Sequence, residues 1–158
     1  MYLLDANELI QAAREYYAFD IAPGFWEWLD SCMACGEIGS IEAVRKELLA
    51  GNDQLSIWAK QRPNYFLGID SDTVAKFAPL TQWAASQDFT PTALNKFAGD
   101  AADYLLVAYA AAHDHTVVTK EKPDPHSKKR VKIPDACAAM GVATANLYDV
   151  MRATKAKL

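Results

Sequence analysis

Acidic side chains follow or open several apolar segments of this sequence, at positions where a buried strand would end and the next helix would begin. They are Asp5 after YLL, Asp100 and Asp103 at the start of an alanine-rich segment, Glu121 after TVVT, and Asp135 in IPDACAAM. Carboxylates that lie close together repel one another unless a cation binds between them, and several acids without His or Cys suit Mg²⁺ or Mn²⁺. The pattern favours a divalent metal site, although a single Asp of this kind is more often only a helix cap.

The elements that would position these acids are short buried strands alternating with helices. Such alternation is typical of a mainly parallel sheet with helices on both faces, so we expect an α/β fold, a three-layer α/β/α sandwich. Ligands in these folds bind at the carboxyl ends of the strands, where the acids would converge. Apolar runs predict strands within residues 2–4, 64–70, 116–119 and 141–147, and periodicity predicts helices at 7–17, 23–36, 40–49, 72–86, 100–113, 133–141 and 148–157.

Three polar or proline residues make local predictions about these elements. Ser40 precedes a periodic run and is predicted to cap the helix at 40–49. Pro79 is expected to kink or break the helix at 72–86. Asn7 is expected either to cap the first helix or to hydrogen-bond the acidic site.

Length and composition indicate one globular domain spanning residues 1–158. Apolar residues make up 51% of the chain and charged residues 23%, which excludes the polar class of chains that stays disordered. No uncharged apolar run approaches the ~18 residues of a membrane span, and Asp5 and Glu8 interrupt the start, where a signal peptide would be apolar. Three cysteines do not indicate a disulfide framework, so we expect a cytoplasmic protein that does not engage a membrane.

Residues 120–132, called the basic segment below, differ in charge from the rest of the chain. The segment carries a net charge of +4, whereas the remainder carries −8. A basic stretch on an acidic body suits either contact with a phosphate backbone or a solvated, mobile loop, and both readings remain open. The candidate RNA-binding residues are Lys120, Lys122, Lys128, Lys129, Arg130 and Lys132.

Several motifs resemble those of PIN-domain nucleases. They are LLDAN at the start, Ser40 followed by Glu47-Leu48, and Asp103 placed sixteen positions before Thr119 in DYLLVAYAAAHDHTVVTKE. IPDAC at 133–137, followed by GVATANL, resembles a bacterial branch of PIN-like domains of unknown function, which are similar to the toxins of toxin–antitoxin pairs. These motifs cover most of the chain, so the resemblance implies a single PIN-like domain.

The resemblance also implies a function and roles for particular residues. The activity is Mg²⁺- or Mn²⁺-dependent hydrolysis of single-stranded RNA, and the partner is a cognate antitoxin protein. The catalytic acids implied are Asp5, Glu47, Asp103 and Glu121, with Asp135 as an additional or substitute fourth acid; all of these except Glu47 are expected to bind the metal. The residues expected to support the site are Asn7, Ser40, Asp100 and Thr119.

The sequence leaves two alternative functions open, and it also suggests one surface for contact with a second protein. A receiver-type phosphoacceptor domain has the same sandwich and would use Asp70, Thr119 and Lys132, although only one acid follows the first strand. A PIN-like body that no longer cleaves RNA would serve only as a binding partner. Trp26 falls off the apolar face of helix 23–36 and is expected to mark a homodimer or partner surface.

Overall fold

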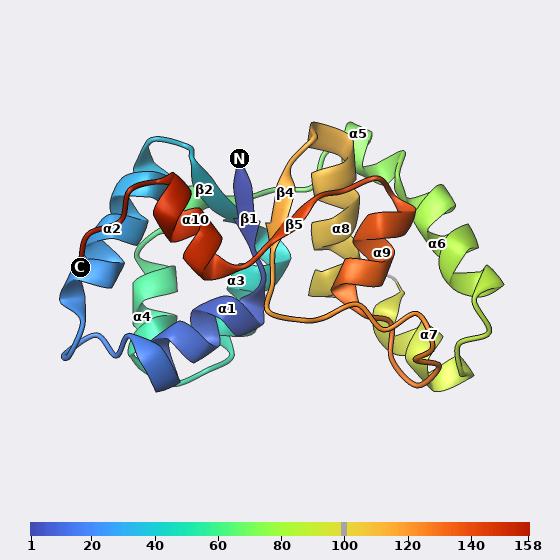
Figure 1. Cartoon of the computed structure of the whole chain (residues 1–158), viewed down its shortest axis with the longest axis horizontal. Coiled ribbons are helices and arrows are strands. Elements are labelled where there is room, and N and C mark those ends of the chain that lie inside the picture. Colours follow the sequence, from blue (N-terminus) through green and yellow to red (C-terminus); the bar gives the residue numbers. More distant parts are fainter. Residues whose placement is uncertain (99–100) are drawn as a thin grey trace.

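The computed structural model describes residues 1–98 and 101–158, and a five-stranded parallel sheet lies at its centre (Figure 1). The strand order is β3-β2-β1-β4-β5, and every neighbouring pair runs in the same direction. This confirms the predicted α/β class with a parallel sheet. The strands are β1 (Tyr2–Leu4), β2 (Ile38–Ile41), β3 (Phe66–Leu67), β4 (Thr116–Val118) and β5 (Thr144–Ala145).

Helices cover both faces of this sheet and complete the three-layer sandwich. In Figure 1, α2 and α10 lie on one side of the strands, and α8 and α9 lie on the other. The helices are α1 (Ala6–Gln11), α2 (Pro23–Ala34), α3 (Glu42–Leu49), α4 (Gln54–Lys60), α5 (Ser71–Val74), α6 (Phe77–Ser86), α7 (Pro91–Phe97), α8 (Ala102–His113), α9 (Ile133–Ala139) and α10 (Leu147–Ala153). A π-helical turn (Ala12–Tyr16) extends α1, and a 3₁₀ turn (Pro63–Tyr65) precedes β3.

Two local predictions are wrong, and both errors have a physical reason. Ser40 does not cap a helix, because it lies inside β2, a strand that the sequence patterns did not reveal. The short IGSI run contains a glycine and a serine, so it lacks the apolar signature of a buried strand. Pro79 breaks nothing: it is the third residue of α6, where a first-turn proline is tolerated, and the chain is interrupted earlier, between α5 and α6.

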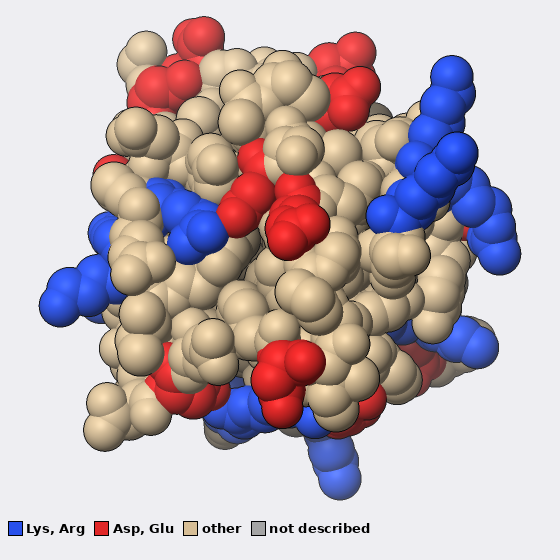
Figure 2. Space-filling view, turned by 90° about the vertical axis from the view of Figure 1, so that its left-hand side faces the viewer, with Lys and Arg blue, Asp and Glu red and all other residues tan. Residues whose placement is uncertain are grey.

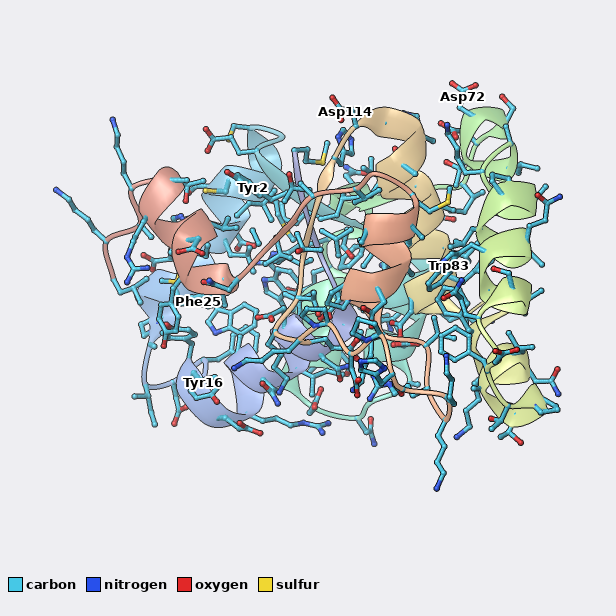
Figure 3. All side chains as sticks on the ribbon, turned by 45° about the vertical axis from the view of Figure 1, so that its right-hand side comes forward. Tyr2, Tyr16, Phe25, Asp72, Trp83 and Asp114 are labelled. Atoms are coloured by element: carbon cyan, nitrogen blue, oxygen red, sulfur yellow. The ribbon has the colours of Figure 1, made fainter. Side chains whose placement is uncertain are left out.

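The prediction for Trp26 is also wrong, because its side chain is buried in the layer that α2 forms on the sheet. Its indole N–H donates to the carbonyl of Tyr17 at 2.7 Å, and its ring stacks on Phe19 at 3.9 Å. The neighbouring Phe25, labelled in Figure 3, stacks on the Tyr17 ring at 4.2 Å. Trp26 therefore gives no support to a homodimer surface.

The outer surface of the α2 side carries charges of both signs. Figure 2 shows this face, with acidic side chains near its middle and along its upper and lower edges, and basic side chains at its left, right and lower edges. None of the helices in the described part of the chain is long and apolar enough to span a membrane.

Candidate functional site: an acidic cluster at the carboxyl edge of the sheet

Asp5 is held where β1 ends and α1 begins. Its Oδ1 atom accepts the backbone N–H of Glu8 at 2.7 Å, which makes Asp5 the N-cap of α1. Its Oδ2 atom accepts the hydroxyl of Thr119 at 2.6 Å, just beyond the end of β4. The residue is 1% exposed. Asp5 thus joins the carboxyl ends of two adjacent strands, and Asn7, an exposed residue in the first turn of α1, is not the cap.

Burial raises the pKa of Asp5 to about 6 and outweighs the hydrogen bonds from Thr119 and Glu8, which lower it. The charges of Asp103 and Glu121 add to the increase. These negative charges act on Asp5 in a poorly solvated space, which makes its ionised form less favourable. Parallel strands end on the same side of a sheet, and Asp5 and Thr119 follow β1 and β4 at that edge.

Asp103 and Glu47 reach the same space from two different helices. Asp103 is the second residue of α8, and Glu47 lies in the last turn of α3. Burial raises the pKa of Glu47, and the charges of Asp103 and Asp5 raise it further. Burial also raises the pKa of Asp103, followed by the charge of Glu121, while Arg130 lowers it. The helix α8 is apolar around most of its surface and buried against the sheet, which fixes Asp103 at this edge.

Ser40 and Thr119 contact the acids or their backbone. The Ser40 hydroxyl donates to the carbonyl of Leu4 at 2.7 Å, directly before Asp5, and both hydrogen-bonding groups are buried. The Thr119 hydroxyl also accepts the backbone N–H of Glu121 at 3.2 Å. Each of these polar side chains therefore ties a strand end to the cluster. Asp100, also expected to support the site, lies outside the described residues.

Glu8 is a fifth acid in this neighbourhood that the sequence patterns did not single out. It is 7% exposed, and its Oε1 atom has no hydrogen-bond partner among the described residues. Burial raises the pKa of Glu8 to about 7, with a further contribution from the charge of Asp5 and a smaller opposing one from Lys120. The sequence did offer one sign that Glu8 lies near Asp5. Glu8 follows Asp5 by three residues, a spacing that places two side chains on the same side of a helix.

Glu121 lies near the start of the basic segment and contacts residues at and just beyond the end of the same segment. Its Oε1 atom pairs with the guanidinium of Arg130, and its Oε2 atom accepts the backbone N–H of Ile133 at 2.9 Å. Only 8% of its side chain is exposed. Glu121 therefore closes the basic segment onto the edge of the site, while its charge still reaches Asp5 and Asp103.

The basic segment is tied to the body of the protein at further points. The backbone N–H of Thr90 donates to the carbonyl of Lys128 at 2.9 Å, and the Lys128 ammonium donates to the carbonyl of Gln87 at 2.8 Å. The Asp135 Oδ2 atom accepts the backbone N–H of Asp124 at 2.8 Å. A solvated, mobile loop would not make these contacts with the rest of the protein. The structure therefore favours an ordered conformation for the basic segment.

Asp135 occupies a different neighbourhood from the other acids. It lines an open pocket of about 220 Å³ with Trp83, Phe89 and Asp124. Figure 3 shows Trp83 between α6 and α9. Asp135 thus lines a different pocket from Asp103 and holds the basic segment through the backbone of Asp124.

The donor set of the cluster suits a hard divalent cation. Its side chains offer carboxylate oxygens, and their mutual repulsion and burial would be relieved by a bound positive charge. Within residues 1–98 and 101–158, no three acid, His or Cys side chains are arranged to hold one ion together. Mg²⁺ is commonly bound by one or two carboxylates, and waters fill the rest of its coordination shell.

The arrangement excludes the receiver-type alternative. Asp70 caps α5, and its Oδ2 atom lies 2.9 Å from His113 Nε2 at the end of α8, directly before β4 begins. Thr119 lies at the other end of β4, bonded to Asp5. Asp72 lies two residues after Asp70, and Asp114 directly follows His113. Figure 3 shows both at the amino edge of the sheet. Asp70 and Thr119 therefore lie at opposite edges and cannot form one phosphoacceptor site.

This fold is of the PIN-like class, as comparison with solved structures shows. The structure of FitAB bound to an IR36 DNA fragment matches with a TM-score of 0.55 and 19% identity, over 92% of this chain and 94% of that chain. FitAcB from Neisseria gonorrhoeae matches with a TM-score of 0.55 and 18% identity, over 94% and 99%. VapBC2 from Rickettsia felis, bound to a DNA fragment from its promoter, matches with a TM-score of 0.57 and 13% identity, over 92% and 97%.

The chain belongs to the family described as "Domain of unknown function (DUF4411)", whose model matches residues 2–158. Comparison with curated proteins finds no match. At identities below 20%, the likeness to the solved structures establishes the fold and leaves the activity to be argued from the site.

Proposed function

We propose that this chain is a metal-dependent endoribonuclease that hydrolyses single-stranded RNA as the toxin of a bacterial toxin–antitoxin pair. The observation that carries the proposal is the convergence of Asp5, Glu47, Asp103 and Glu121 beside a basic segment, with the pKa values of the first three raised. Buried carboxylates that repel one another destabilise a fold, so their convergence calls for a positively charged ligand.

The chain's own residues would divide the work of hydrolysis. Asp5 and Asp103 would hold Mg²⁺ or Mn²⁺, which supplies water activation and charge neutralisation at the phosphate. Glu47 and Glu121 would orient water molecules around the site or accept a proton. The Thr119 hydroxyl holds the Asp5 carboxylate in place through the 2.6 Å hydrogen bond. The basic segment would bind the RNA backbone, which the acidic cluster alone would repel.

An antitoxin partner follows from the same proposal. The similar structures are FitAB, FitAcB and VapBC2, and two of their descriptions name bound DNA. For this chain, a second protein that covers the acidic edge would restrain cleavage. Cytoplasmic location fits this role and stays a prediction.

The test is cleavage of a mixed pool of single-stranded RNA by the purified protein with Mg²⁺, Mn²⁺ or EDTA. Asp5→Asn and Asp103→Asn should each abolish metal-dependent cleavage. Asp72→Asn is the matched control, because Asp72 is an exposed acid in the first turn of a helix at the opposite edge. Cleavage that persists in EDTA, or in both site variants, would refute the proposal, and a folded protein that never cleaves RNA would favour the binding-only alternative.

A further inference from the structure

A second pocket opens beside Asp103, on the side of the basic segment. Its volume is about 330 Å³, and it is lined by α7, by the basic segment and by Asp103 itself. The pocket is open to solvent at one side, because Lys96, Lys129 and Arg130 around it are exposed. Its volume lies at the lower end of the range of small-molecule binding pockets.

The charges around this pocket are mostly positive. Lys96 comes from α7, and Lys129 and Arg130 come from the basic segment, while Asp103 is the one acid among the lining residues that the structure describes. The sequence did not single out Lys96, because it is an isolated lysine more than twenty residues before the basic segment. Three cations from two separate parts of the chain therefore meet next to the acidic cluster.

The two walls that carry these cations are fixed to each other. Thr90 caps α7 by accepting the backbone N–H of Ala93 at 3.2 Å, and its own N–H donates to the carbonyl of Lys128 at 2.9 Å. Buried apolar side chains, Phe97 from α7 and Val131 from the basic segment, form part of the same lining. The backbones that carry Lys96 and Lys129 are thus held in place by packing and backbone pairing.

Arg130 connects this pocket to the acidic cluster. It pairs with Glu121 Oε1 through one terminal nitrogen, and its charge also acts on Asp103. A guanidinium has five N–H donors in a planar fork, so a partner on Glu121 leaves donors for an anion in the pocket. Arginine suits phosphate because two of its donors match two phosphate oxygens.

We infer that this pocket binds a backbone phosphate of single-stranded RNA beside the acidic cluster, with Lys96, Lys129 and Arg130 as its ligands. The inference rests on the proposed function and names the site that would position the substrate. A phosphate held there would counter the repulsion between the RNA backbone and the carboxylates, and would place an adjacent phosphodiester against Asp103.

The experiment measures binding separately from cleavage. Labelled single-stranded RNA is titrated with the Asp5→Asn protein in EDTA by fluorescence anisotropy, over a series of salt concentrations. Adding Lys96→Glu should weaken binding about tenfold and make the slope of log affinity against log salt shallower by about 0.7, the value for one lost phosphate contact. Lys129→Glu should act in the same way.

Lys157→Glu is the matched control, because Lys157 is exposed near the carboxyl terminus, on the opposite side of the molecule from α7 (Figure 1). Circular dichroism and thermal unfolding of every variant verify that the fold is intact. A second arm measures binding of inorganic phosphate by calorimetry. Binding of phosphate without binding of RNA would overturn the assignment of the ligand.

The outcomes separate this inference from the proposed function. Unchanged RNA affinity in Lys96→Glu, in a protein whose cleavage still requires Asp5, would overturn the pocket and leave the nuclease proposal standing. RNA binding that requires Lys96, in a protein that never cleaves, would support the pocket and refute the nuclease. Absence of RNA binding in every preparation would overturn the pocket.

Discussion

Asp5 and Asp70 make nearly the same contacts at opposite edges of the sheet, yet their pKa values move in opposite directions. Each caps a helix by accepting the backbone N–H three residues later, at 2.7 Å for Asp5 and 2.9 Å for Asp70. Each also accepts a threonine hydroxyl, from Thr119 at 2.6 Å and from Thr73 at 2.7 Å. Capping alone therefore does not distinguish a site residue from a structural one.

The difference arises from burial and from neighbouring charges. Asp5 is buried among other carboxylates, and burial raises its pKa to about 6. The Asp70 side chain is 44% exposed, and its hydrogen bonds with Thr73 lower its pKa, with His113 nearby. Water solvates the charge of Asp70, whereas the charge of Asp5 has no such compensation. Burial, more than capping, therefore distinguishes Asp5 from Asp70.

The largest expected difference between the two caps is in catalysis. Asp5→Asn should reduce metal-dependent RNA cleavage by at least about 100-fold, because the variant loses a negatively charged oxygen at the metal. Asp70→Asn should cleave like the parent protein. The measurement is kcat/KM on a defined single-stranded RNA. Equal losses in both variants would mean that Asp5 acts only as a cap.

Metal binding should distinguish Asp103, an acid of the cluster, from Asp70 at the opposite edge of the sheet. Adding Mn²⁺ to the EDTA-treated protein should raise its Tm by several degrees at concentrations far above Kd, because a ligand that binds only the folded state stabilises it. The Tm increase should disappear in Asp103→Asn and persist in Asp70→Asn, as followed by scanning calorimetry. An equal increase in every variant would place the metal elsewhere.

The stability of the metal-free protein should fall as pH rises through the range set by Glu8. The folded-state pKa of Glu8 is about 7, above its ordinary value of 4.5, so the folded state binds the proton more tightly than the unfolded state does. Its contribution is complete below about pH 4.5 and is lost between about pH 5 and 7. Glu8→Gln should therefore stabilise the protein at pH 8 by about 1–2 kcal/mol.

Urea unfolding in EDTA at pH 5 and pH 8 measures this effect. The parent should lose stability between the two pH values, and Glu8→Gln should lose less. Asp70 has the opposite sign: its pKa is lowered, so its contribution is present above pH 4 and is lost at lower pH. A Glu8→Gln variant with the parent's pH dependence would show that Glu8 is solvated.

The smallest expected effect comes from removing the hydroxyl of Thr119 or of Thr73, which bond to Asp5 and Asp70 respectively. Thr119→Val removes a hydroxyl that stabilises the charged form of Asp5, so the pKa of Asp5 should rise further and the acidic limb of the activity profile should move to higher pH. Thr73→Val removes the equivalent hydroxyl from Asp70 and should leave that limb in place. The pH dependence of kcat/KM, measured for both variants, decides between them. A shift of the limb in Thr73→Val would contradict the separation of the two edges.

Much of the fold could be predicted, because its strands and helices carry clear local patterns. YLL and TVVT are uninterrupted apolar runs and became β1 and β4, and the alanine-rich segment became α8. The strand β2 could not be recognised, because IGSI is buried by its neighbours rather than by its own apolar character. Trp26 was misplaced because helical periodicity considers one face, whereas the chain before α2 covers the other.

The sequence by itself determined the class of the fold and the edge at which acids would gather, because parallel strands must all end on one side. It also determined that a basic segment would follow β4. Only the tertiary structure decided which acids meet, because burial and distance depend on elements far apart in the chain. Those contacts brought Glu8 close to Asp5, placed Asp135 in another pocket, and put Lys96 and Lys129 in the lining of one pocket.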